Sequence, residues 1–316
     1  MNILITGGSG FVGSHMARRL VSMPGAKVTL WLRPTSNLWR IHDIKDKLSI
    51  EHVDLKDADA VRDAAQALRP DVIYHFANAG VYGGVSASPV ELTAINVGGL
   101  KHLIDGLEDI PFTSFINVGS SSEYGLKNAP MKEGDECNPQ NAYGVSKLAA
   151  TRIASEEARL KELPIATYRL FSPFGPYDDA SRLIMQTMRA CLHKTPMTLP
   201  HPASVRDYNY IDDVIDLLFE AMQLKASGEV FNVGYGVETK ALDFAYQIAD
   251  VMNARDFLDT CSRTETLGPS ESPRWQADTT KLFSTLKWRP RYTVQEGIAK
   301  TVEWYKANES LYKPTK

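Results

Sequence analysis

An apolar run that passes straight into regularly spaced glycines is the feature that most constrains the fold of this chain. Asn2–Thr6 is typical of a β-strand, and Gly7, Gly10 and Gly13 follow it at the start of a helical pattern. Glycine is needed where the chain turns tightly, where a ligand approaches the backbone and where the helix packs on the strand. The unpaired N–H groups at the helix start attract phosphate. The residues expected to hold the diphosphate of a dinucleotide are Gly7, Gly10, Phe11, Val12 and Gly13.

The first half of the chain alternates short apolar runs with amphipathic segments. The expected strands are Asn2–Thr6, Lys27–Leu32, Leu48–Val53, Val72–Phe76, Ser114–Val118 and Ile165–Arg169. The expected helices between them are Gly13–Ser22, Ala58–Leu68, Ala94–Leu107 and Tyr143–Lys161. This alternation predicts an α/β fold with a Rossmann-type doubly wound parallel sheet, which binds ligands at the carboxyl ends of its strands.

The regular alternation of expected strands and helices ends in the second half of the chain. Ser172–Pro176 and His193–Pro202 are rich in proline and turn residues, whereas a helix near Ile211–Lys225 and a strand at Glu229–Val233 still belong with the sheet. We therefore expect a dinucleotide-binding domain and a smaller, interwoven substrate-binding cap. The expected boundaries are 1–170 with 207–235 returning for the first, and 171–206 with 236–316 for the second.

Charge and cysteine usage exclude several function classes. A formal net charge of −3 provides no basic surface for nucleic acid or an anionic membrane, and no apolar run reaches the length of about 18 residues that a membrane span needs. Cys137, Cys191 and Cys261 lack CxxC spacing and no Cys/His cluster has metal-ligand spacing, so we expect reduced thiols and no metal. The chain starts without the pattern of a signal peptide, which predicts a cytoplasmic protein.

The end of the second strand bears on the choice of dinucleotide. Arg33 follows that strand, with Ser36 and Arg40 close behind it, where an NAD-selective site usually has Asp or Glu. A guanidinium suits a 2′-phosphate because its planar fork can pair with two phosphate oxygens. The pattern therefore favours NADP(H), with NAD(H) as the alternative. Asp54 and Leu55 close the third strand, where the carboxylate either accepts from an adenine amino group or caps the next helix.

Tyr143 and Lys147 stand four residues apart, so they share one face of a helix. The ordinary pKa of a phenol is about 10, and a neighbouring ammonium favours the phenolate. Such a tyrosine can take a proton from a hydroxyl while hydride leaves the same carbon. Upstream, three serines follow a strand, and one of them can donate to the substrate oxygen. Together these groups predict an NAD(P)-dependent oxidoreductase, and a cofactor-binding sensor without chemistry is the alternative.

These stretches resemble the extended short-chain dehydrogenase/reductases, specifically the NAD(P)-dependent nucleotide-sugar epimerase/dehydratase family. The likeness covers nearly the whole chain and rests on Thr6–Gly13, Asp54-Leu55, His75–Ala77, Asn96–Gly99, Ser120–Gly125, Tyr143–Lys147, Arg169–Pro176, Arg206–Asp213 and Leu286–Pro290. It implies transient oxidation, usually at sugar C4, and contact of Ala77 with the cofactor. Because the family's motif hydroxyl lies four residues before the tyrosine of a Tyr-Gly pair, it also implies Ser120, Tyr143 and Lys147 as the catalytic residues.

The resemblance also bears on the substrate. The family's 4,6-dehydratases carry acidic residues directly after the motif hydroxyl, where this chain has two serines, and Glu123 falls one place late. That departure favours an epimerase or a 4-ketoreductase, although a small loop shift that brings Glu123 into the reaction would keep a dehydratase open. The residues expected to bind a nucleotide sugar are Tyr82, in the segment 78–88, Ser121, Ser122, Arg182, Arg206 and Arg274. A homodimer through the helices near 94–107 and 143–161 is also implied.

Overall fold

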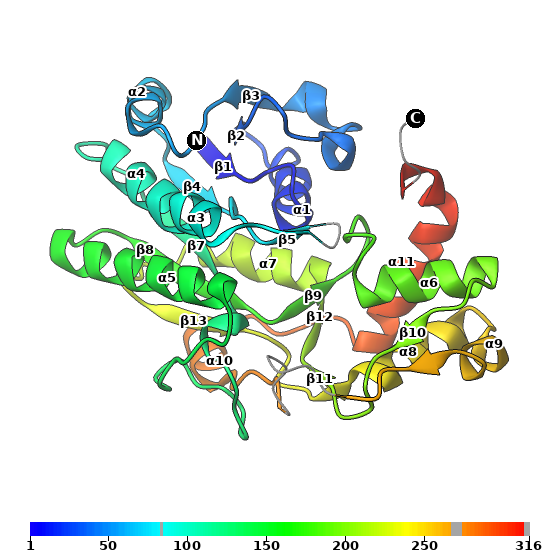
Figure 1. Cartoon of the computed structure of the whole chain (residues 1–316). Coiled ribbons are helices and arrows are strands. Elements are labelled where there is room, and N and C mark those ends of the chain that lie inside the picture. The colour runs from blue at the N-terminus through cyan, green and yellow to red at the C-terminus, as the bar shows by residue number, and fades with distance from the viewer. Residues whose placement is uncertain (83–84, 267–273, 313–316) are drawn as a thin grey trace.

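A seven-stranded sheet forms the centre of the computed structural model, which describes residues 1–82, 85–266 and 274–312 (Figure 1). In sheet order the strands are β13 (Val230–Val233), β8 (Ile165–Leu170), β7 (Ser114–Ser120), β4 (Val72–His75), β1 (Asn2–Thr6), β2 (Lys27–Leu32) and β3 (Ser49–His52). All neighbours pair in parallel. From β1 the chain passes to β2 and β3 on one side and then crosses to β4 on the other side of β1. A crevice opens at the carboxyl ends of β1 and β4, where the strand order reverses. The predicted Rossmann-type sheet is confirmed.

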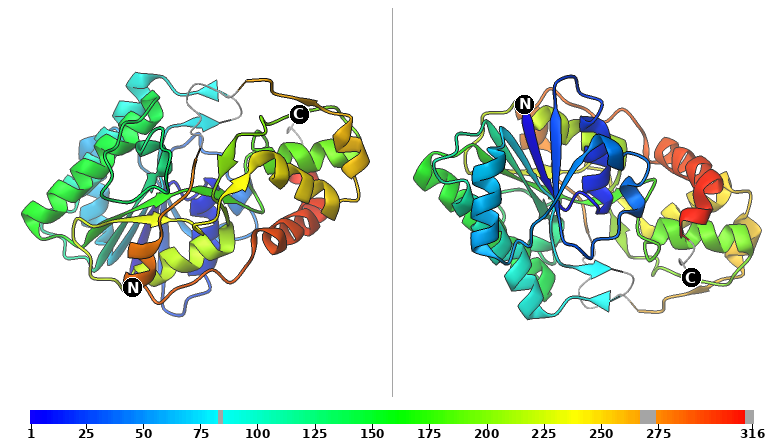
Figure 2. Two further views of the ribbon diagram at one scale, coloured as in Figure 1. Left: turned by 90° about the horizontal axis from the view of Figure 1, so that it is seen from below. Right: turned by 90° about the horizontal axis from the view of Figure 1, so that it is seen from above.

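Helices cover both faces of the sheet (Figures 1 and 2). One layer consists of α1 (Phe11–Leu20) and α7 (Ile211–Ala221), and the other of α2 (Ala58–Leu68), α4 (Gly99–Gly106) and α5 (Ala142–Lys161). Successive side chains of a strand point to opposite faces. Ile3 and Ile5 therefore join the core under α1 and α7, while Leu4 joins the core under α2, α4 and α5.

A second group of helices, which we call the cap, lies to one side of the sheet (Figure 1). The cap contains α6 (Leu183–His193), α8 (Ala241–Val251), α9 (Arg255–Asp259), α11 (Val294–Asn308) and the short η5 (Glu309–Tyr312). Phe174, Phe244 and Ile298 belong to the same buried cluster as Ile3, so the core under α1 and α7 continues into the cap. This shared core is consistent with an interwoven cap, whose boundaries stay a proposal.

Short elements complete the chain. Four two-stranded pairs are β5 (Val81–Tyr82) with β6 (Val85–Ser86), β9 (Ser172–Phe174) with β12 (Tyr208–Tyr210), β10 (Thr198–Leu199) with β15 (Ser262–Arg263), and β11 (Val205–Arg206) with β14 (Thr239–Lys240). The remaining helical segments are η1 (Trp39–Ile41), η2 (Lys45–Lys47), α3 (Pro89–Leu92), η3 (Thr93–Gly98), η4 (Ser121–Glu123) and α10 (Thr280–Thr285).

Two elements differ from the sequence prediction. The stretch 172–176, expected as turns, begins with β9, which pairs in parallel with β12. The helix expected over 94–107 begins as the π-helical turn η3. Within η3, the buried Asn96 accepts from Ala79 N at 2.6 Å and donates to Ala79 O at 3.0 Å. The widened turn thus places the side-chain amide of Asn96 where it pairs with the backbone N–H and C=O of Ala79, just after β4.

No helix in the described ranges is long and apolar enough to cross a membrane. Across those same ranges, no three His, Cys, Asp or Glu side chains gather in a way that could hold a metal ion. The three cysteines are free thiols.

Candidate active site

A cleft of about 1170 Å³ opens beyond the carboxyl ends of β1, β2, β4 and β7 and is closed from the other side by the cap. Most residues selected from the sequence line it: Gly7, Gly10, Phe11, Val12, Gly13, Arg33, Ser36, Asp54, Leu55, Ala77, Ser120, Ser121, Ser122, Tyr143, Arg182 and Arg206. Lys147 is buried and Arg274 lies outside the lining. The backbone of Tyr82 is in β5, and its side chain lies outside the part that the structure describes.

The glycine turn leaves no room for side chains. Gly7 has φ +69°, and a Cβ there would lie 2.5 Å from the backbone nitrogen of Ala77. A Cβ on Gly13 would lie 2.4 Å from the carbonyl oxygen of Gly7. Gly10 is the N-cap of α1 and supplies no side-chain cap, so N–H groups of the first turn remain for a ligand. These residues fit the diphosphate of a dinucleotide, because both the close approach and the helix start are available.

The far end of this half of the cleft carries the groups expected near an adenosine. Arg33 is exposed and Ser36 is half-buried, and Ser36 N donates to Arg33 O at 2.9 Å. Asp54 Oδ1 accepts from Lys56 N at 3.0 Å, whereas Asp57 is the N-cap of α2. The helix-cap alternative for Asp54 is therefore wrong, and its carboxylate instead closes a turn at the cleft wall.

The start of α5 positions the predicted tyrosine and lysine. Asn141 caps the helix by accepting from Gly144 N at 2.8 Å. Tyr143 lies over the backbone of Gly80, where a Cβ would be 3.3 Å from the tyrosine ring. Lys147, one turn later, is 5% exposed and donates to Val118 O at 2.5 Å. Burial lowers the pKa of Lys147 to about 8, and the negative charge of Glu123 opposes that shift. At neutral pH the lysine therefore stays an ammonium.

The three serines form the start of η4. Ser120 is its N-cap, and its Oγ accepts from Ser122 N at 3.1 Å. Ser121 is 4% exposed, and its Oγ accepts from the indole nitrogen of Trp275 at 2.7 Å. Ser122 is half-buried, and a Cβ on Gly144 would lie 2.5 Å from Ser122 O, so α5 packs directly on this loop.

Glu123 does not face the cleft. Its side chain is completely buried, Oε1 accepts from Ser120 N at 2.8 Å, and Oε2 accepts from Arg169 Nε at 2.7 Å. Ser120 and Glu123 together form a capping box. A small loop shift cannot bring this carboxylate to a substrate without breaking the buried ion pair. The Ser-x-x-Glu spacing is a capping signature and could have been recognised in the sequence.

The side of the cleft that is expected to bind the substrate comes from the cap and the segments next to it. Arg182 is exposed at the start of α6, and the Arg206 guanidinium lies 5.3 Å from the ring centroid of Trp275. Trp275 lines the cleft and was missed in the sequence, where nothing marks it except its place beside Arg274. Arg274 pairs with Glu238 at 2.7 Å. Its predicted role in substrate binding stays a prediction.

Two buried carboxylates from the stretch 206–213 fasten the cap, a role that the sequence did not reveal. Asp207 accepts from the backbone nitrogens of Tyr235, Gly236 and Ala277 at 2.9 to 3.1 Å. Asp213 accepts from the backbone nitrogens of Arg291 and Tyr292 and from the hydroxyl of Tyr235. They tie the segments that precede α10 and α11 to the stretch that leads into α7.

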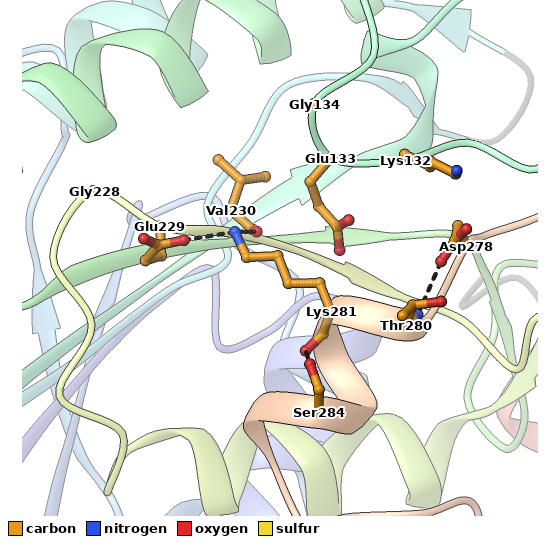
Figure 3. A pocket seen from close by; sticks show the side chains of 10 residues that line it. All are labelled: Lys132, Glu133, Gly134, Gly228, Glu229, Val230, Asp278, Thr280, Lys281 and Ser284. Carbon is orange, nitrogen blue, oxygen red and sulfur yellow. Dashed lines mark hydrogen bonds and ion pairs between the residues drawn. The ribbon is translucent and has the colours of Figure 1, made fainter.

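A second cavity of about 680 Å³ lies elsewhere, beside β13 and α10 (Figure 3). Its Lys281 donates to Glu229 at 2.5 Å and to Val230 O at 2.8 Å. The residues that line it include none of the site residues predicted from the sequence.

Comparison with known proteins agrees with the predicted fold and family. The sequence profile of the NAD dependent epimerase/dehydratase family matches residues 3–234. A probable dTDP-glucose 4,6-dehydratase of Sinorhizobium fredii is 25% identical, covering 99% of this chain and 95% of the relative. The UDP-glucose 4-epimerase of Mycolicibacterium smegmatis is 29% identical, covering 97% of this chain and 99% of the relative.

Solved structures share the whole fold. The dTDP-glucose 4,6-dehydratase of Bacillus anthracis in complex with NAD has a TM-score of 0.88 at 24% identity and covers 100% of both chains. The UDP-glucuronic acid 4-epimerase of Bacillus cereus in complex with UDP-glucuronic acid and NAD has a TM-score of 0.85 at 24% identity, covering 97% of this chain and 99% of that one. Because the family profile spans most of the sequence, the chain belongs to the NAD dependent epimerase/dehydratase family.

Proposed function

We propose that this chain is a nucleotide-sugar 4-epimerase or 4-ketoreductase, with Ser120, Tyr143 and Lys147 as its catalytic residues. One observation carries the proposal: the glycine turn, Ser120 and Tyr143 line a single cleft, and the buried Lys147 stands one helical turn beyond Tyr143. Relatives from both the epimerase and the dehydratase groups support a nucleotide sugar as the substrate class.

The chemistry follows from the charges in the cleft. A nicotinamide ring held beyond the turn 7–13 would accept a hydride from the sugar carbon or return one to it. The Lys147 ammonium stabilises the phenolate of Tyr143, which takes the proton from the sugar hydroxyl or gives it back. Ser120 donates to the same oxygen and holds it beside Tyr143. Arg182 and Arg206 bind the substrate diphosphate across the cleft.

A 4,6-dehydratase is the second candidate, favoured by the names of several relatives. Dehydration needs an acid and a base at C5 and C6, beyond the groups that act at C4. Ser121 and Ser122 occupy the positions after the motif hydroxyl, and Glu123 is buried against Arg169. These three residues support the epimerase or ketoreductase over the dehydratase.

The comparisons favour NAD(H) as the cofactor, because similar solved structures are complexes with NAD. They do not support the preference for NADP(H) that the sequence suggested. The exposed Arg33 at the adenosine end of the cleft keeps NADP(H) as the second candidate. Binding titrations with both dinucleotides decide between them.

A homodimer through α4 and α5 is also proposed. Val145 and Leu160 of α5 are 53% and 63% exposed, and Lys101 of α4 pairs with Glu157 of α5, so the two helices present a joint outer surface. Sedimentation velocity tests it: the native chain is expected to sediment as a dimer and a Val145→Glu/Leu160→Glu variant as a monomer.

The proposed reaction is tested by product analysis. Purified protein is incubated with UDP-, GDP-, CDP- and dTDP-sugars, alone or as their 4-keto forms with reduced dinucleotide, and the products are identified by mass and NMR. We expect a 4-epimer from one nucleotide sugar or a reduced sugar from one 4-keto substrate. Formation of a stable 4-keto-6-deoxy sugar without added reductant would instead identify a dehydratase.

A further inference from the structure

We propose that Glu123 is a positioning residue of the active site: its buried carboxylate fixes the backbone of Ser120 and keeps the Lys147 ammonium charged. The inference rests on the proposed function for the roles of Ser120 and Lys147. Glu123 itself does not line the cleft and so cannot touch a substrate.

Glu123 uses both of its carboxylate oxygens as hydrogen-bond acceptors. Oε1 accepts from Ser120 N and Oε2 accepts from Arg169 Nε, with the two side chains 0% and 2% exposed. Gly119 lies opposite Arg169 in the pairing of β7 with β8. A Cβ on Gly119 would be 2.7 Å from Glu123 Oε1 and 3.1 Å from Arg169 Cγ. The glycine therefore makes the space in which the ion pair sits, directly before Ser120.

The arginine is itself held in place. Its guanidinium lies 4.5 Å from the ring centroid of Tyr124, whose hydroxyl donates to Asn232 Oδ1 at 2.7 Å. Asn232 donates from its side chain to Met131 O, and its backbone nitrogen donates to Glu133 at the edge of the cavity in Figure 3. Glu123 thus contacts the fixed Arg169 with one carboxylate oxygen and Ser120 N with the other. The position of the arginine therefore determines the position of the serine backbone.

Glu123 also acts on the charge of Lys147. Lys147 donates to Val118 O and Glu123 accepts from Ser120 N, so both side chains contact the last three residues of β7. Burial disfavours the charged form of Lys147, and Glu123 is the anion that favours it.

His75 of β4 also interacts electrostatically with Lys147, and Tyr143 stands one helical turn before it in α5. Burial and the nearby Lys147 lower the pKa of His75 to about 3. An imidazole is neutral or cationic, so it cannot replace the negative charge of Glu123. Arg169 is the ion-pair partner of Glu123 and supplies no negative charge.

The Glu123 capping box differs from the two other capping boxes in the described part of the chain, which shows that its glutamate does more than cap a helix. In the described part of the chain, boxes also begin α3, with Ser88 and Glu91, and α11, with Thr293 and Glu296. Both of those glutamates are exposed, and their recorded hydrogen bonds go to the cap residue alone. A capping box therefore needs no buried arginine. A buried ion pair adds little net stability over apolar residues, so stability does not explain why this box has one.

The experiment compares variants that separate charge from hydrogen bonding. Glu123→Gln keeps an oxygen for Ser120 N and removes the charge. Because it leaves Arg169 buried without an anion and can unfold the protein, the same change is also made together with Arg169→Met. A third protein, Glu123→Ala with Arg169→Met, removes the acceptor as well. Glu296→Gln is the matched control, since it changes a capping-box glutamate far from the cleft.

The first readout is the titration of Lys147, followed by the carbon-13 shift of its Cε and assigned with Lys147→Met. We expect the pKa of Lys147 to fall by about one unit in folded Glu123→Gln relative to the native protein, and in Glu123→Gln/Arg169→Met relative to Arg169→Met, which lacks the same cation. Glu296→Gln should leave this pKa unchanged. The basic limb of the kcat/KM profile is expected to move with the pKa of Lys147. A Lys147 titration that is the same in Glu123→Gln/Arg169→Met as in Arg169→Met would overturn the electrostatic role.

The second readout is kcat in the two double variants, which share the same charge. We expect kcat to be about tenfold lower with alanine than with glutamine at position 123, and KM to change little, because only the placement of Ser120 differs. Equal kcat values would overturn the positioning role. The lysine titration needs no substrate, so it decides the electrostatic part even if no nucleotide sugar is turned over and the proposed function fails.

Discussion

The two sides of the cleft are built from different parts of the polypeptide. The cofactor side is mostly backbone: Gly7 and Gly13 leave no space for a Cβ, and the helix start of α1 supplies N–H groups. The substrate side is mostly long side chains, with Arg182, Arg206 and Trp275 reaching in from the cap and its margin. A binding site built by backbone contacts tolerates almost no substitution. A binding site built by side chains can be altered by substitution to accept a different ligand. The difference predicts where mutations abolish function and where they alter specificity.

The proposed catalytic pair, Tyr143 and Lys147, stands between the two sides, and its loss has the largest expected effect. Tyr143→Phe removes the proton acceptor but keeps the ring against Gly80, so kcat is expected to fall by about 10³-fold, as for the loss of a general acid-base group. The dissociation constant of the dinucleotide should stay within about threefold of the native value. Steady-state kinetics and a fluorescence titration measure the two quantities. Near-native turnover in this variant is incompatible with the proposed mechanism.

A side chain in the glycine turn is expected to break the cofactor side. Gly13→Val forces a Cβ against the carbonyl oxygen of Gly7, and the dissociation constant of the dinucleotide should rise by about 100-fold through displacement of the turn. Gly134→Val is the matched control, because a Cβ at Gly134 meets no atom within 4 Å. Calorimetric titration compares the two variants, with circular dichroism as the check of folding. Equal affinities would contradict a backbone cradle at this turn.

Shortening a cap arginine is expected to act on the substrate alone. Arg206→Ala removes a charged donor from the cleft wall, which should raise KM for the nucleotide sugar by about 30-fold and leave dinucleotide affinity unchanged. Arg274→Ala provides the contrast, because Arg274 lies outside the lining and pairs with Glu238. If Arg274→Ala has the larger effect on KM, the described cap geometry does not represent the substrate-bound state.

The smallest effect is expected where the cofactor side itself depends on a side chain. Arg33→Asp replaces a guanidinium at the end of β2 with a carboxylate, which repels a 2′-phosphate and accepts from a 2′-hydroxyl. The ratio of the dissociation constants for NADP⁺ and NAD⁺ should rise by about tenfold or more. Parallel titrations with both dinucleotides give the ratio. An unchanged ratio would place the 2′-position of the ribose away from Arg33.

The sequence predicted the cofactor side better than the substrate side for a physical reason. The bounds of β1, β2 and α2 agree with the predicted ranges because apolar periodicity and glycine spacing are local signals. The contact of Trp275 with Ser121 joins residues 154 positions apart, so no local sequence pattern predicts it. Strand β9 has three residues and contains Pro173, which gives too little alternation to recognise.

Glu123 shows a different limit of the sequence. Its position, one place late, left a reacting acid open through a small loop shift, although the same spacing is a capping signature. The choice between the two depended on Arg169, which lies on a neighbouring strand and turns the carboxylate away from the cleft. Whether such a glutamate reacts or caps depends on which residues strand pairing brings beside it, and this pairing is visible only in the folded chain.

The central claim is that the ammonium of Lys147 makes the phenol of Tyr143 acidic enough to exchange a proton with a sugar hydroxyl. An ultraviolet difference titration of the native protein against Tyr143→Phe isolates the phenolate signal of this one tyrosine. We predict that Tyr143 titrates well below the ordinary phenol pKa of about 10, and that Lys147→Met moves the titration upward. A Tyr143 pKa of about 10 or higher that is the same with and without Lys147 would contradict the account.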